Sequence, residues 1–239
     1  MTPRGRAVTV LIAALLGAAL TARLGLWQLD RAAQKVAAAA AVEAQGSLPA
    51  LTNAEIAKVA AQLNRRVSLR GRWLAEKTVF LDNRPMDGHV GFFVLTPLQL
   101  EGRSETVLVQ RGWVPRNNLD RTQLPSLPTP ADVVEVQGRL TASPSRLYEF
   151  SASPLGPIRQ NMTVETLAAE IKQPMLPLTV LQLGTSTDGL LRDWPAADLG
   201  LQKHYGYAFQ WFALCALILG LYVWFQLVKP RRTAGSRDE

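Results

Sequence analysis

The chain has 239 residues, and its 26 Lys and Arg residues exceed its 19 Asp and Glu residues, so the formal net charge is +7. Nucleic-acid binding needs basic residues gathered on one face, but here they are scattered along the middle of the chain. A single cysteine excludes an intramolecular disulfide, a CxxC redox pair and a thiolate zinc site. We therefore expect no nucleic-acid partner, and stability that comes from packing and from a membrane.

The first apolar segment begins at Ala7 and reads AVTVLIAALLGAALTA, without a charge. The apolar pattern resumes after Arg23 and reaches Leu29, which gives the roughly 20 residues that a bilayer core requires. A cleaved secretory signal is the alternative, because two arginines precede the run. No A-x-A cleavage site follows the run, so we predict a retained transmembrane helix over residues 7–29.

The region 30–203 begins with an Ala-rich stretch, residues 32–45, that we expect to extend the first helix. A short helix is predicted over residues 53–63, and another over residues 164–172. Six segments are rich in β-branched and aromatic residues, and several of them alternate with the period of a strand. They are RVSLRGRWL (66–74), KTVFLDNR (77–84), VGFFVLTPLQL (90–100), ETVLVQRGWVP (105–115), DVVEVQGRLT (132–141) and MLPLTVLQLG (175–184).

The connections between the strand segments are short. Residues 83–88 carry the Pro and Gly of a hairpin loop, and residues 101–104, which include Gly102, supply another. Such loops favour an antiparallel meander. We predict an α+β membrane protein, in which two transmembrane helices flank an antiparallel β-rich domain, a barrel or a sandwich, with minor helices.

A second apolar segment covers residues 207–228, has no charge, and carries aromatic residues at both ends, as is typical of membrane interfaces. With the residues that precede it, it predicts a second transmembrane helix over residues 204–228. Both outer segments, 1–6 and 229–239, are basic. The positive-inside rule therefore predicts both termini in the cytoplasm and the β-rich domain, residues 30–203, on the other side of the membrane.

The sequence shows none of the common catalytic signatures: G-x-S-x-G, a P-loop, GxGxxG after a strand, or HExxH. Asp82 and Asp87 flank an expected turn, and we interpret them as turn residues. His89 follows Gly88 and is interpreted as a solvated loop residue. We therefore expect no enzymatic activity.

His204 begins the second membrane helix, and Tyr207, Trp211 and Cys215 follow it on one helical face. An imidazole in this position could serve as an axial ligand of haem iron. An interfacial histidine that hydrogen-bonds to a carbonyl or a headgroup is the commoner case, and Cys215 is more often a small apolar residue. Spacing alone therefore favours a structural role for His204.

Trp27, Arg31 and Lys35 recur every four residues as the first helix leaves the membrane. In one interpretation, Trp27 lies at the membrane interface and the two cations bind lipid phosphates. In the other, the cations form a positively charged surface that binds haem propionates or an acidic partner protein. The sequence leaves both interpretations open.

Six motifs occur in one order along the chain, from the first membrane helix to the second. They are LGLWQLDRAAQK (24–35), GRWL (71–74), FLDNRPMDGHVGFFVLTPL (80–98), VLVQRGWVPRN (107–117), VQGRL (136–140) and HYGYAFQWF (204–212). Together they closely resemble the surfeit locus protein family, membrane-anchored assembly factors of cytochrome c oxidase. For a bacterial member, the resemblance implies a protein of the cell inner membrane with a periplasmic β-rich domain. It also implies binding of haem a as cargo, oxidase subunit I as a partner, and haem a synthase as a further one.

The resemblance also bears on single residues. It implies that His204 is the axial ligand of haem a, with Tyr207 and Trp211 in the matching aromatic pattern. Contacts of Arg31, Lys35 or Lys203 with the propionates are a hypothesis without a family assignment behind it. A membrane-anchored scaffold that docks oxidase subunits, without a direct role for haem, is the alternative function.

Overall fold

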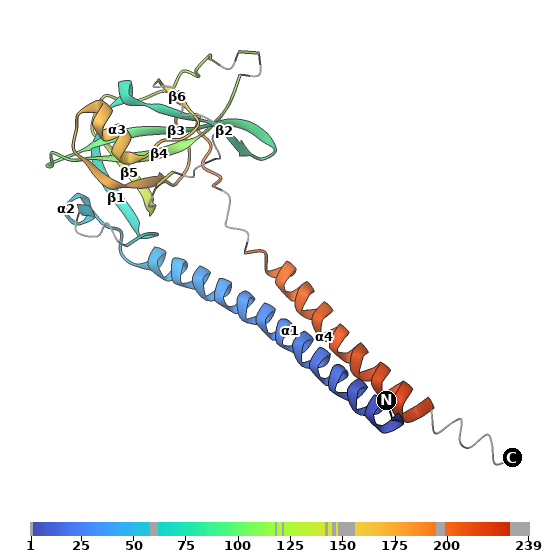
Figure 1. Ribbon diagram of the computed structural model, residues 1–239. Helices are drawn as coiled ribbons and strands as arrows, with labels where there is room; N and C mark the ends of the chain where they lie inside the picture. Colours follow the sequence, from blue (N-terminus) through green and yellow to red (C-terminus); the bar gives the residue numbers. More distant parts are fainter. Residues whose placement is uncertain are drawn as a thin grey trace. The chain divides into compact units, whose positions relative to one another are not determined.

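The computed structural model describes residues 2–57, 62–117, 119–120, 122–141, 143–144, 147, 156–194 and 199–229 (Figure 1). The chain forms two compact units, a helical unit from residues 1–40 and 197–239 and a β-rich unit from residues 41–196. The predicted basic tail, residues 229–239, lies outside the described residues except for Lys229.

The helical unit contains two long helices. Helix α1 spans Pro3–Ser47, and helix α4 spans Leu201–Val223 and continues into a π-helical turn over Trp224–Val228. The alanine and leucine that dominate α1 have high helix propensity, so the predicted extension beyond the apolar segment is confirmed. The helices lie side by side and run antiparallel (Figure 1), because Gln28 contacts His204 and Ala18 contacts Cys215.

Both helices are long and apolar enough to cross a membrane. Within the most apolar window of α1 only 11% of the residues are buried, and within that of α4 none are. A core helix of a soluble protein buries its apolar side chains, whereas these two expose them. They are therefore candidate membrane spans, and they contain the predicted segments 7–29 and 204–228.

Small side chains form the face of α1 that packs on α4. Ala18, Thr21, Gly25 and Ala32 are buried and recur at intervals of three, four and seven residues. This spacing is that of helix pairs with a slight left-handed supercoil, in which small residues allow close approach. A Cβ atom added at Gly25 would lie 2.8 Å from the ring of Phe212 on α4.

Within its described residues, the β-rich unit contains seven strands, which are β1 (Arg66–Trp73), β2 (Val79–Met86), β3 (His89–Leu100), β4 (Thr106–Pro115), β5 (Val134–Thr141), β6 (Ile158–Arg159) and β7 (Met175–Gln182). Its short helices are α2 (Asn53–Ile56), a 3-10 helix over Ala75–Lys77, and α3 (Val164–Ile171). The strand order is β1-β5-β7-β4-β3-β2-β6, and β1 also pairs with β3. This extra pairing closes β1, β5, β7, β4 and β3 into a barrel, so of the two predicted architectures the barrel is the one observed.

The topology differs from a complete antiparallel meander. Strands β2, β3 and β4 form the expected meander, but β4 pairs with β7 in parallel and β2 pairs with β6 in parallel. A parallel pair needs a crossover connection, and the chain supplies one between β4 and β7 that includes β5 and α3. Residue patterns identify strands but not their neighbours, so the meander prediction is wrong for these pairs.

Two local boundaries also differ from the predictions. The loop expected at residues 83–88 is a two-residue turn at Asp87 and Gly88, both with positive φ (48° and 78°), as a tight hairpin requires. Asn83 lies at a bulge within β2, with φ 62°. The helix expected over residues 53–63 ends at Ile56 as α2, and residues 58–61 lie outside the described part of the chain.

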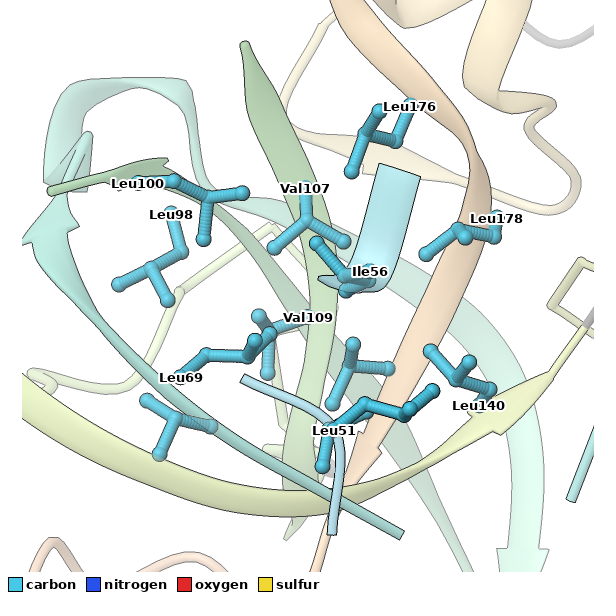
Figure 2. Close-up of a cluster of buried hydrophobic side chains, with 13 residues drawn as sticks. Leu51, Ile56, Leu69, Leu98, Leu100, Val107, Val109, Leu140, Leu176 and Leu178 are labelled. Atoms are coloured by element: carbon cyan, nitrogen blue, oxygen red, sulfur yellow. The ribbon is translucent and has the colours of Figure 1, made fainter. Parts of the chain in front are cut away.

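The interior of the barrel is apolar and is plugged at one end by α2. Figure 2 shows the side chain of Ile56 among the inward-facing side chains of the strands. Ile56 is fully buried and Leu51 beside it nearly so, and an isolated bridge joins Leu51 to Val67 of β1. On the outer face, Val164 and Leu167 of α3 join a second buried cluster. The barrel therefore has one closed end.

Candidate functional site

His204 lies on the face of α4 that contacts α1. Its Nδ1 atom is 2.8 Å from the side-chain amide oxygen of Gln28. Both residues are half-buried. They lie at the end of the helix pair where α4 begins. His204 is thus held by a partner on the other helix.

This hydrogen bond determines the tautomer of the imidazole. The amide oxygen of Gln28 can only accept, so Nδ1 of His204 donates its proton and, in the neutral ring, Nε2 keeps a lone pair. No other hydrogen bond to the ring occurs among the described residues. Histidines that ligate metals usually donate their other N–H in this way, which orients the ring and raises its basicity. The site is therefore suited to ligation through Nε2.

Of the two predicted aromatic neighbours of His204, Trp211 lies on the same face of α4 and Tyr207 does not. Ala208 is buried and Trp211 is half-buried on the same face of α4 as His204. Tyr207 is 53% exposed and lies to the side of this face. Cys215 lies two turns beyond Ala208, and its thiol donates to the carbonyl oxygen of Ala18 at 3.3 Å. Cys215 therefore has the packing role that the sequence favoured.

The three predicted cations are exposed, and their described contacts differ. Lys35 donates to the carbonyl oxygen of Leu199 at 2.8 Å, just before α4 begins. Arg31 donates to the amide oxygen of Gln34 on its own helix. The backbone N–H of Lys203 donates to the carbonyl oxygen of Gly200 in the first turn of α4. Lys35 thus links α1 to the residues just before α4, while the side chains of Arg31 and Lys203 form no hydrogen bond or ion pair with the opposite helix among the described residues.

Sequence reasoning missed Gln28. One signal pointed to it: Gln28 is an uncharged polar residue inside the apolar run LGLWQL, seven residues after Thr21 and three after Gly25. That spacing places it on the small-residue face of α1, which packs on α4. The identity of its partner could not be read from the spacing.

The sequence placed Asp82 in a turn and His89 in a loop, but Asp82 lies within β2 and His89 is the first residue of β3. Asp82 forms an ion pair with Arg116 at 3.3 Å, Asp87 lies in the β2–β3 turn, and His89 is exposed beside the carbonyl oxygen of Asp87. Within the part of the chain that the structure describes, no group of three or more His, Cys, Asp or Glu residues could hold a metal ion. His204 is the candidate ligand in the helical unit.

Fold and site together define a class: a protein with a closed β-barrel domain and two candidate membrane helices, which hold a positioned histidine at their interface. The chain belongs to the SURF1 family, whose sequence model matches residues 15–216. This is the surfeit locus family that the six motifs resemble.

Three relatives illustrate the range of similarity. A SURF1-like protein of Rickettsia bellii is 24% identical over 213 residues, which cover 83% of each chain. A SURF1-like protein of Drosophila melanogaster is 30% identical over 123 residues, covering 44% of this chain and 41% of the fly protein. One of Rickettsia felis is 31% identical over 97 residues, covering 40% of this chain and 42% of that protein.

Proposed function

We propose that this protein binds haem a and assists its insertion into, or its stabilisation in, subunit I of cytochrome c oxidase. The SURF1 family is a family of oxidase assembly factors. The observation that carries the finer proposal is the hydrogen bond between Gln28 and His204, because it presents the lone pair of Nε2 for an iron atom. Haem a is cargo here, and the protein itself has no catalytic role.

The chemistry of the helix pair fits this cargo. Iron of haem a would be ligated by His204 while Gln28 keeps the imidazole oriented. The exposed apolar side chains of α1 and α4, such as Leu20, Leu26 and Phe209, match a porphyrin with a long isoprenoid tail. Lys35, with Arg31 and Lys203, supplies positive charge for the propionates.

The proposal includes a location, the bacterial inner membrane with the β-barrel in the periplasm. Two apolar helices of sufficient length and the basic outer ends of the chain support it. His204 and Gln28 then lie at the periplasmic end of the helix pair. Haem a synthase, which makes the cargo, is the proposed donor, and subunit I is the proposed acceptor.

The test is co-expression of the full chain with and without the enzymes of haem a synthesis, followed by purification in detergent. We expect the wild-type protein to show the absorption spectrum of histidine-ligated haem a only when those enzymes are present. The His204→Ala variant should insert into the membrane but lose most of its haem. His89→Ala is the matched control, because His89 is the other histidine of the chain and is exposed in the barrel.

Two outcomes would contradict the proposal. Equal haem content and an unchanged spectrum in the His204→Ala variant would exclude His204 as the ligand. A His204→Ala variant that still co-purifies with subunit I and supports full oxidase activity would favour a scaffold that docks oxidase subunits without a direct role for haem.

A further inference from the structure

The end of the barrel opposite α2 forms a hollow with a volume of about 470 Å³. Four of its lining residues lie on the same strand faces as the side chains that fill the barrel interior. Arg111 follows Val107 and Val109 on β4, Gln182 follows Leu178 and Val180 on β7, Trp73 follows Leu69 on β1, and Val136 belongs to β5. Since alternate residues of a strand share a face, this hollow is the open mouth of the barrel.

The side chain of Arg111 lies in this mouth and is only 2% exposed. It donates to the hydroxyl of Thr129 at 2.9 Å, to the carbonyl oxygen of Pro128 at 3.1 Å and to the carboxylate of Asp188 at 3.1 Å. Its guanidinium carbon lies 4.8 Å from the centre of the Trp73 ring. The guanidinium is therefore held rigidly in place.

A second guanidinium shares the same carboxylate. Arg192, whose side chain is 7% exposed, donates to the Oδ2 atom of Asp188 at 2.7 Å and to the carbonyl oxygen of Arg111 at 2.7 Å. The two guanidiniums thus share the single carboxylate of Asp188. Glu135 also lines the hollow, but it is exposed and its carboxylate accepts a hydrogen bond from the hydroxyl of Ser68 on β1.

Two buried polar atoms in the mouth lack a hydrogen-bond partner among the described residues. They are Nε of Arg111, a donor, and the amide oxygen of Gln182, an acceptor. The two residues are adjacent in register, because Gln110 pairs with Leu181 in the parallel β4–β7 ladder. An unsatisfied buried donor on a charged group costs more than one on a neutral group. Burial also lowers the pKa of Arg111, although the hydrogen bond and charge of Asp188 oppose this effect.

We infer that the barrel mouth is a binding site for a small organic carboxylate. A carboxylate in the hollow would lie against the Arg111, Arg192 and Asp188 cluster and neutralise its excess positive charge. Trp73 with Pro128 and Pro130 lines the hollow with apolar surface for the body of the ligand, and its volume lies in the range of small-molecule pockets. This site belongs to the β-rich unit and does not depend on the proposed role in haem binding.

The test is isothermal titration calorimetry of the full chain in detergent, with benzoate as the probe and benzamide as its neutral counterpart. We expect saturable binding of one benzoate per chain and at least tenfold weaker binding of benzamide. Arg192→Gln should weaken benzoate binding at least tenfold. Arg159→Gln is the matched control, because Arg159 is paired with Glu170 outside the mouth and its loss should leave benzoate binding unchanged.

If Arg192→Gln unfolds the barrel, a second variant, Asp188→Asn, still tests the inference. Asp188→Asn removes the resident anion, so benzoate should bind it more tightly than the wild type and should raise its thermal midpoint more than benzamide does. Absence of benzoate binding in both proteins would overturn the inference. Equal binding by the wild type and Arg192→Gln, or weaker binding by Asp188→Asn, would also overturn it.

Discussion

The amide oxygen of Gln28 on α1 accepts a hydrogen bond from Nδ1 of His204 on α4 at 2.8 Å, across 176 positions of sequence. The contact ties the orientation of the histidine to the packing of two helices. A residue with no predicted role is therefore the positioning residue of the site.

Gln28→Ala should weaken binding of haem a by about 10- to 100-fold, the usual cost of losing a residue that orients a metal ligand. His204 would remain, so the ligation should persist with a shifted absorption band. The measurement is haem titration followed by spectroscopy, and Gln28→Glu, which retains an acceptor, should restore most of the affinity. Gln45→Ala, at an exposed position near the C-terminal end of α1, is the control. An equal loss in that variant would contradict a specific role for Gln28.

A cysteine at position 18 should form a disulfide with Cys215. The thiol of Cys215 lies 3.3 Å from the carbonyl oxygen of Ala18, so the two backbones approach closely, and a disulfide requires Cα atoms within about 7 Å. Mild oxidation of membranes that contain the Ala18→Cys variant should abolish maleimide labelling without producing a dimer. Ala19→Cys, on the exposed side of α1, should remain labelled. If both variants were labelled equally, α1 and α4 would not pack as described.

Gly112→Ala should destabilise the barrel by about 1–3 kcal/mol, as overpacking of a well-filled site does. A Cβ atom at position 112 would lie 2.5 Å from Cβ of Leu190 and 2.9 Å from the carbonyl oxygen of Leu191. Leu190→Gly is itself destabilising, because Leu190 is fully buried, but it removes the Cβ atom that the added Cβ atom would meet. In the double variant part of the strain is relieved, so the two losses should be less than additive in urea denaturation. Strict additivity would show that the two positions do not interact.

Asp188 should make the stability of the barrel depend on pH in the acid range. Burial alone would raise the pKa of Asp188, but the charges of Arg192 and Arg111 outweigh it, so the pKa lies below its ordinary value. A lowered pKa stabilises the fold fully above the ordinary value, about 4, and this stabilisation is lost as pH falls through the folded value. Asp188→Asn should therefore be less stable than the wild type at pH 7, and the difference should shrink below about pH 4.

Thermal unfolding of the wild type and of Asp188→Asn, measured between pH 3 and 7 by tryptophan fluorescence, checks this dependence. Parallel curves at all pH values would mean that the carboxylate of Asp188 contributes no charge interaction. Glu135→Gln is the control, because Glu135 is exposed and pairs with a hydroxyl rather than with a cation.

Residue patterns predicted β1 to β5 and β7 to within two residues at each end. The alternation in β1 from Val67 to Trp73 matches the observed burial, and both long helices follow from runs of apolar residues. The position of His204 at the start of the second apolar helix was equally clear. These features are local, since they depend on which face of one element is apolar.

The partners of these elements were decided only in three dimensions. Backbone hydrogen bonds are the same for any neighbouring strand. The sequences of the strands therefore do not predict that β4 pairs with β7 in parallel, or that β1 pairs with β3 and closes the barrel. The same holds for Gln28 and His204, and for Arg111 and Asp188, whose distant positions meet only after folding. Periodicity thus determined which faces are buried, whereas packing of one face against another decided which polar groups meet and therefore where a ligand can be held.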